Sequence, residues 1–344
     1  MQHSGVDQPK APKSHAELQD QMRRELKKEM ELQAKPKQKW EYKTAAELEA
    51  SSPSRKDGLD PIKEGRWRRE FMAIITKAGM TLRIPQWGIA VAGLLCHRFF
   101  SRKSMKRNDR TTVACACLHL AAKMEEAPKS IKDVVREVVR VRYARDGEAL
   151  ARALAPDELE RYKEQVLVAE RAVLYTLGFD LNTAHPYTFL VSQMSKLGLL
   201  GDEGSSYRTL MQDTWNFVND SFRSTLCLQF PPDKIAAAAL WLASHLAYTS
   251  EQLKAGVAPP AIKQEPGQDA QGAAVRALLT TGDGQQRPIS GVLDQVLEAK
   301  SREGVVPKGS DFFAYFGVSR EEMEAIATQI LQLYEETKLA QAAR

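Results

Sequence analysis

Two charged side chains of opposite sign are notable because each falls in an otherwise apolar helical pattern. Lys123 ends the almost wholly apolar stretch 113–122. Glu170 falls inside the apolar stripe of the segment 156–177 when successive residues are placed about 100° apart around a helix. A carboxylate on a buried face is costly unless it is paired, so Lys123 is its expected partner. Two interpretations are open: a structural salt bridge, or a charged couple presented to another protein.

Sequence motifs of catalysis are missing. The chain has no GxxxxGK phosphate loop, no HExxH metal motif and no GxSxG nucleophile motif. Its six histidines are scattered, and His97, His119 and His245 lie in apolar helical patterns, where a hydrogen-bonded histidine is the simplest interpretation. No two carboxylates are spaced for acid–base catalysis. We therefore predict a binding protein rather than an enzyme.

Composition excludes several further classes. The four cysteines fall in apolar patterns without a CxxC pair, which favours reduced, buried thiols and no metal site or other cofactor. No run of about 18 apolar residues is free of charges, so no membrane span is expected. The first residues lack the hydrophobic core of a secretory signal. No small-molecule ligand is indicated.

The net charge of +5 is mild, and it permits an acidic partner without requiring one. The sharpest local bias is the predicted loop 98–110, where six basic residues accompany one acidic residue, Asp109. A solvated loop and a contact with phosphorylated or acidic segments are both open interpretations. Only Phe99 and Phe100 interleave with these charges, so direct nucleic-acid binding is not expected.

The charged pair requires helices to position it, and the sequence predicts an all-α fold. The segment 111–126 is apolar all round, so neighbouring helices should enclose it. Asp109 is a good N-cap type before it, and Pro128 ends it. Four further helices should surround it, with Gly79 as the C-cap of the first and Trp87 facing inward from the second. The last of the four carries Glu170 and ends at Gly178.

The same arrangement recurs about 120 residues later, around a second small-residue helix that begins after Pro231-Pro232. We expect two helical units of about five helices each, with a central third helix in each. The predicted boundaries are a flexible or helical N-terminal arm (1–39), a first unit (40–182), the first part of a second unit (183–249), a disordered insertion rich in Gly, Pro, Gln and Ala (250–309), and the last helices of the second unit with a tail (310–344).

Five segments together resemble the cyclin family, in their order and spacing. They are SPSRKDG at 52–58, HRFF at 97–100, LAAKMEE at 120–126, LGFDLNTAHPY at 177–187 and WNFVNDSFRSTLCLQF at 215–230. Within the family they are most similar to cyclin T of plants and green algae, and next to cyclin K. The resemblance runs from about residue 40 to 247 and resumes from 311 to 336. It implies that the two units are cyclin boxes, the second of them split by the insertion.

The resemblance also implies a role and a site. A cyclin binds a cyclin-dependent kinase as a heterodimer and holds the αC helix of the kinase inward. Carried over by motif, Lys123 and Glu170 lie on the kinase-facing surface, Phe179 supplies an apolar contact, and Glu126 supports Lys123. His119 stands where the family usually has an aromatic or aliphatic side chain, which changes the apolar part of this contact.

The class of cyclin follows from motifs that are present and missing. Cell-cycle cyclins carry an MRxxLxxW-type docking pattern on the first helix, whereas the matching segment here, 71–76, lacks that Arg and Trp. The WNFVNDS segment resembles transcription cyclins. The resemblance therefore implies a nuclear activating subunit whose kinase phosphorylates the C-terminal tail of RNA polymerase II and promotes transcription elongation.

Two alternatives remain open. A general transcription factor with a cyclin fold would bind DNA directly, with a steep dependence on salt. Such proteins carry a Cys-rich zinc ribbon near the N-terminus, but this chain has no cysteine before Cys96. The second alternative is a helical scaffold with no kinase partner, which co-purification would distinguish from a kinase activator.

Overall fold

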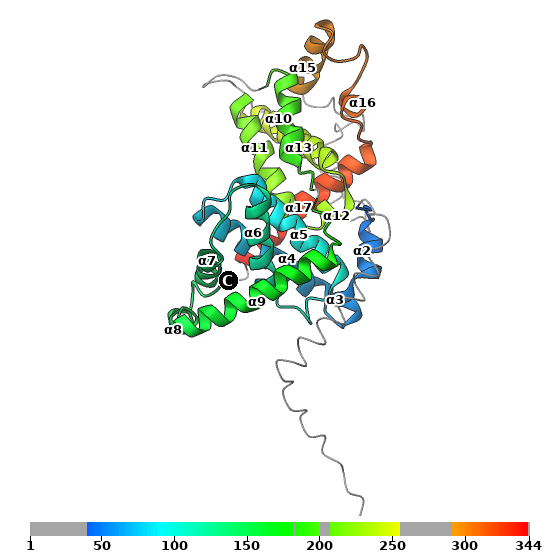
Figure 1. Cartoon of the computed structure of the whole chain (residues 1–344). Helices are drawn as coiled ribbons and strands as arrows, with labels where there is room; N and C mark the ends of the chain where they lie inside the picture. The colour runs from blue at the N-terminus through cyan, green and yellow to red at the C-terminus, as the bar shows by residue number, and fades with distance from the viewer. Residues whose placement is uncertain (1–39, 182, 200–206, 255–290, 343–344) are drawn as a thin grey trace, which may run out of the picture.

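The computed structural model describes residues 40–181, 183–199, 207–254 and 291–342. Throughout these ranges the regular structure is helical and no strand occurs, so the predicted all-α class is confirmed. The helices form two units that lie one above the other in Figure 1. The predicted N-terminal arm, residues 1–39, lies outside the described residues. In the part of the chain that is described, no helix combines the length and apolarity that crossing a membrane requires.

The first unit is built around α6 (Arg110–Met124), which is apolar on every side as the sequence predicts. All residues from Thr111 to Ala122 are buried. Asp109 caps the helix by accepting a hydrogen bond from the N–H of Thr112 at 2.8 Å. The helices that contact α6 are α4 (Pro61–Thr81), α5 (Gln86–Arg102), α7 (Ile131–Arg142) and α9 (Pro156–Thr176).

Glycines let the helices of the first unit approach closely, which offsets their low helix propensity. A Cβ atom on Gly93 of α5 would lie 2.7 Å from Sδ of Met72 in α4. The predicted C-cap role of Gly79 is wrong, because α4 continues to Thr81 and its C-cap is Leu82. Gly79 instead packs against α5, where a Cβ atom would lie 2.7 Å from Cγ1 of Ile89.

The second unit repeats the plan around α13 (Pro232–Lys254), whose residues 235–243 are buried. The helices α10 (Pro186–Lys196), α11 (Tyr207–Ser221), α12 (Leu226–Gln229), α15 (Gly291–Arg302), α16 (Phe312–Phe316) and α17 (Arg320–Ala342) contact it. α6 and α13 are thus the central helices of the two units, and each is rich in alanine, which allows the surrounding helices to lie close.

Helices occupy part of the segment 250–309 on both sides of residues 255–290. α13 continues to Lys254, and α15 begins at Gly291 and buries Leu293 and Leu297 within the second unit. The prediction of one disordered insertion over 250–309 is therefore wrong for these helices. Residues 255–290 lie outside the described residues. The sequence itself allows a short helix over 289–300 within this segment, and α15 forms there.

An N-terminal segment joins the two units on one side. It contains α2 (Ala45–Ser51) and α3 (Pro53–Lys56), and a further short helix, α8 (Gly147–Ala153), precedes α9. The N–H of Lys43 donates to the carbonyl of Leu228 at 3.2 Å, which ties this segment to the second unit. The ring of Trp40 lies 4.7 Å from the guanidinium of Arg98 and 5.4 Å from that of Arg102, both in the first unit.

The prediction of a basic loop over 98–110 is partly wrong. α5 extends to Arg102, so Arg98, Phe99 and Phe100 are buried helical residues. Further along, Arg107 pairs with Asp57 at 2.6 Å and Arg110 with Glu70 at 2.8 Å. These side chains serve contacts within the chain, which removes most of the motivation for an acidic partner at this segment.

A buried polar chain connects the two units. The carboxylate of Glu64 accepts from the guanidinium of Arg68 at 2.7 Å, and Arg68 donates to Nδ1 of His97 at 3.2 Å. Nε2 of His97 then donates to the carbonyl of Phe222, in the second unit, at 2.8 Å. Because Nδ1 accepts and Nε2 donates, the ring is held neutral in one tautomer. The side-chain nitrogen and oxygen atoms of Glu64, Arg68 and His97 thus have hydrogen-bond partners, as burial demands.

The folding stability should depend on pH because of His97. Burial and the adjacent Arg68 charge lower the pKa of His97 to about 3, whereas an unfolded histidine titrates near 6.5. Between these values the unfolded state binds the proton, so stability should fall as pH drops from about 6.5, by up to about 1.4 kcal/mol per pH unit. Urea unfolding between pH 7 and 5 measures this slope. His97→Gln should flatten the slope, and an unchanged slope would contradict the assignment.

Candidate functional site

The charged pair predicted from the sequence is formed. Lys123 lies in the last turn of α6, and its ammonium group donates to Oε1 of Glu170 on the neighbouring α9. The side chain of Lys123 is 43% exposed and that of Glu170 only 9%. The cation therefore stands at the rim of the first unit, with the carboxylate beneath it. An ammonium group has three donors and Glu170 takes one of them, so Lys123 retains capacity for an acceptor on a partner.

His119 completes the cluster one turn earlier in α6. Its Nδ1 lies 3.3 Å from Oε2 of Glu170, and the residue is 9% exposed. Burial would raise the pKa of Glu170, but hydrogen bonds from His119 and Lys123, with the Lys123 charge, hold it below its ordinary value. The carboxylate thus stays ionised. His119 stands where the cyclin family usually has an aromatic or aliphatic side chain. Here it orients Glu170 and does not offer an apolar surface.

Phe179 follows α9 and presents its ring to solvent. It has φ 56° directly after Gly178 at φ 64°, an uncommon left-handed conformation for a phenylalanine. Its N–H donates to the carbonyl of Leu174 at 3.0 Å, and its ring meets Tyr175 edge-on at 5.5 Å. The side chain is nevertheless 46% exposed. The backbone therefore fixes an aromatic ring at the surface, which is how apolar anchors for a partner are commonly displayed.

Glu126 contributes differently from the prediction. It has φ 52°, its side chain is exposed, and its N–H donates to the carbonyl of Lys123 at 3.4 Å. The contact with Lys123 is thus made by the backbone, which closes the end of α6. The Glu126 carboxylate lies on the surface beyond the pair.

Trp87 is a surface residue that the sequence analysis missed. It was expected to face inward, but its side chain is 44% exposed in the first turn of α5. The next residue, Gly88, abuts the end of α6, since a Cβ atom there would lie 3.5 Å from Cγ of Glu125. Trp87 therefore lies at the same end of the unit as Lys123. The sequence signal for this exposure is the position of Trp87 in the first turn after Pro85, before the buried residues of α5 begin at Gly88.

The remaining polar candidates are structural. Tyr187 donates to Oδ1 of Asn219 at 2.6 Å, and Gln86 donates to the same oxygen at 2.9 Å, which joins α5, α10 and α11. The four cysteines are free and buried. Within the described ranges no group of three His, Cys, Asp or Glu side chains is arranged to hold a metal ion.

Comparison with known proteins identifies relatives of this chain. Residues 40–182 match the family model described as the cyclin N-terminal domain. Cyclin-T1-3 of Oryza sativa subsp. japonica is 43% identical over 203 residues, which cover 59% of this chain and 40% of that protein. The putative cyclin-T1-1 of Arabidopsis thaliana is 40% identical over 201 residues, which cover 58% of this chain and 77% of that protein.

A more distant relative and a solved structure extend the match beyond the first unit. Cyclin-L1 of Gallus gallus is 30% identical over 288 residues, which cover 84% of this chain and 43% of that protein. The crystal structure of the yeast RNA Pol II CTD kinase CTDK-1 complex contains a chain of similar fold. It has a TM-score of 0.51 and 17% identity, and the match covers 76% of this chain and 83% of that one. At this identity the likeness concerns the fold alone.

Proposed function

The chain belongs to the cyclin family, and we propose that it binds and activates a cyclin-dependent serine/threonine kinase of the transcription class. Its homologues are cyclins, which are regulatory subunits of kinase complexes and not catalytic enzymes. The observation that carries the proposal is the pair of Lys123 and Glu170, held at an accessible rim in the same unit as the exposed Trp87 and Phe179.

In this proposal the site acts by differential binding. A kinase that is inactive alone moves its αC helix inward when a cyclin contacts that helix, which completes the internal Lys–Glu pair of the kinase. Lys123 and Glu170 would hydrogen-bond to the kinase, and Phe179 would bury its ring there. The cyclin needs only to bind the active conformer more tightly than the inactive one. Because His119 holds Glu170 in place, little side-chain freedom is lost on binding.

The substrate and setting form the finer part of the proposal. Relatives named cyclin-T1 support a kinase of the transcription class, which would act on the polymerase tail. We infer a nuclear role in transcription elongation. Association of the tagged full chain with a protein kinase, followed by phosphorylation of a polymerase-tail peptide, tests this function. Recovery of no kinase would overturn it and favour a scaffold, and steeply salt-dependent DNA binding would favour a general transcription factor.

The second unit allows a test of which segments activation requires. Deletion of 255–305 would remove α15 and its buried Leu293 and Leu297, so that deletion is expected to destabilise the second unit. Replacing only residues 255–290 with a short Gly/Ser linker should leave kinase activation within about twofold, because loop length costs little free energy. Activity measured on the polymerase-tail peptide checks this. Loss of activation with a normal melting temperature would place residues 255–290 in the interface.

A further inference from the structure

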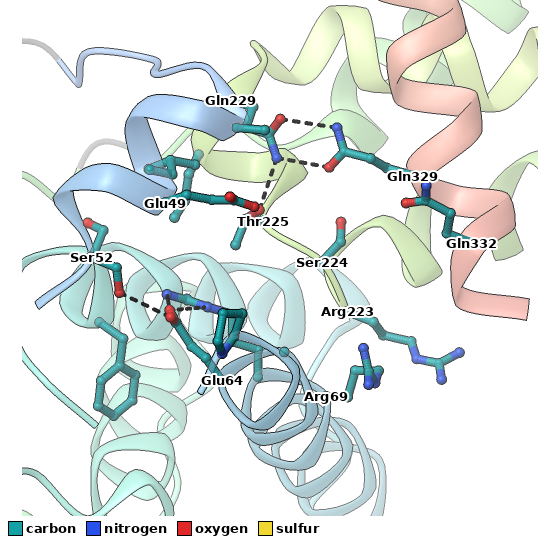
Figure 2. Close-up of a pocket in the computed structure, with 18 of the residues that line it drawn as sticks. Glu49, Ser52, Glu64, Arg69, Arg223, Ser224, Thr225, Gln229, Gln329 and Gln332 are labelled. Atoms are coloured by element: carbon teal, nitrogen blue, oxygen red, sulfur yellow. Dashed lines mark hydrogen bonds and ion pairs between the residues drawn. The ribbon is translucent and has the colours of Figure 1, made fainter. Parts of the chain in front are cut away.

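Two cavities that lie at the junction of the units differ in how their charges are matched. One, of about 300 Å³, lies between α2, α4, α12 and α17, and Figure 2 shows polar side chains that line it. The arginines of this cavity have partners within the chain: Arg68 pairs with Glu64 at 2.7 Å, Arg55 with Glu49 at 3.2 Å and Arg223 with Asp220 at 3.1 Å, and Arg69 is also engaged. The described structure therefore leaves no unpartnered arginine in this cavity for a charged ligand.

The second cavity has a volume of about 20 Å³ and lies beside Arg98, in the last third of α5; we call it the Arg98 cavity. Its walls are mainly apolar and come from both units, with Leu94 from the first and Phe222, Phe230 and Ile235 from the second. A volume of about 10–15 Å³ is enough for one water molecule. The Arg98 cavity therefore has room for a water molecule or a monatomic ion, but not for a phosphate or sulfate group.

Arg98 is a buried cation whose side chain lacks a hydrogen-bond partner. The residue is 5% exposed, and neither Nε nor Nη1 of its guanidinium has a partner among the described residues. Arg98 also forms no ion pair in that part of the chain. The ring of Trp40, at 4.7 Å, offsets part of the cost of burying the charge. Because an arginine stays protonated inside a protein, the rest of that cost calls for an anion close to its donors.

Asp180 does not supply that anion. Burial lowers the pKa of Arg98, and the through-space attraction of the Asp180 carboxylate offsets this shift only in part. Asp180 forms no ion pair with Arg98, and the positive charge of Arg102, one helical turn further along α5, opposes its effect. Nε and Nη1 of Arg98 thus remain available to a small ligand.

We propose that the Arg98 cavity binds one chloride ion, held by Nε and Nη1 of Arg98. A chloride ion accepts N–H hydrogen bonds and brings the negative charge, whereas a water molecule would satisfy the donors and leave the charge unmatched. Arg98 belongs to the first unit, and Phe222 and Cys227 of the same cavity belong to the second. The bound ion therefore stabilises the junction of the two units, and this role is independent of kinase binding.

Thermal melting of the full chain tests the proposal, in sodium chloride and in sodium gluconate at equal ionic strength. Gluconate is too large for the cavity and serves as the reference anion. An ion that binds only the folded state raises the melting temperature, so we expect a value at least about 2 °C higher in about 0.2 M chloride. Bromide should act like chloride. Equal melting temperatures in chloride and gluconate would overturn the proposal.

Two arginine variants separate a bound ion from a general effect of salt. Arg98→Met removes the charge and the donors but keeps a long side chain, so its melting temperature should be the same in the two salts. Arg302→Met removes an arginine of α15 that is 77% exposed, and it should keep the chloride dependence of the natural chain. If the dependence persists in Arg98→Met, the chloride effect does not arise at Arg98 and the proposal fails.

A crystal of the natural chain grown in bromide gives a second measurement, which holds even if Arg98→Met does not fold. Bromide scatters X-rays anomalously, so the expected result is an anomalous peak in the Arg98 cavity, within hydrogen-bonding distance of Nε and Nη1. A water molecule at that position, or a carboxylate of this chain paired with Arg98, would contradict the chloride site.

Discussion

Replacing Lys123 with glutamate is expected to abolish kinase association while the fold persists. The substitution places a second carboxylate beside Glu170 and removes the donors that Lys123 offers a partner. Losing one member of a charged interface pair costs roughly 2–5 kcal/mol, which corresponds to a loss of affinity of about 30-fold to a few thousand-fold. The side chain of Lys123 is 43% exposed, so its own contribution to stability is small, about 0–1 kcal/mol.

The matched control is Arg302→Glu in α15. Arg302 also forms an ion pair, with Glu298 at 2.6 Å, but it is 77% exposed and belongs to the second unit. This charge reversal should leave kinase association unchanged. Co-precipitation with the kinase and thermal melting are measured for both variants. If Lys123→Glu unfolds the chain, the pair is a structural salt bridge, and the site proposed for the kinase loses its main support.

Arg68→Met should be among the most destabilising single substitutions in the first unit. Arg68 and Glu64 are both buried, and removing Arg68 leaves Glu64 with only the partly exposed Arg55, at 3.3 Å, as a charged partner. The same change removes the donor to Nδ1 of His97. Breaking a buried pair in this way costs about 3–5 kcal/mol, which urea unfolding resolves.

Two further variants test the explanation. Arg66→Met, on the same helix, removes a guanidinium that is 62% exposed and lies 3.8 Å from Glu70, so it should cost less than about 0.5 kcal/mol. Adding Glu64→Gln to Arg68→Met removes the buried carboxylate that has lost its nearest charged partner and should restore part of the lost stability. If Arg68→Met costs no more than Arg66→Met, the chain from Glu64 to Phe222 does not hold the units together.

Some features of the site were predictable because they depend on neighbours in sequence. The place of Glu170 within an apolar stripe required a buried partner, and Lys123 at the end of an apolar helix supplied one. The exposure of Phe179 follows a local rule less clearly, since Gly178 signals the end of α9 but not the direction of the next side chain. Motif resemblance, and not periodicity, singled out Phe179.

Other features were decided by packing. His119 reaches a residue 51 positions away, and His97 reaches one 125 positions away, so no local pattern reveals either contact. The inward prediction for Trp87 failed because a helix wheel gives relative angles around one helix and not the neighbours that cover each side. The same reason applies to Gly79, whose side of α4 faces Ile89.

The sequence by itself determined two alanine-rich central helices, the helical class, and a carboxylate that had to be paired, since each follows from the spacing of apolar residues along a helix. Only the tertiary structure decided which charges stay accessible. Lys123 is left at a rim and Arg68 is enclosed, although both are basic residues of helices in one unit. Whether a charged side chain stays accessible depends on which surfaces are buried between the two units and the N-terminal segment. The residues that bury a given surface come from distant parts of the sequence.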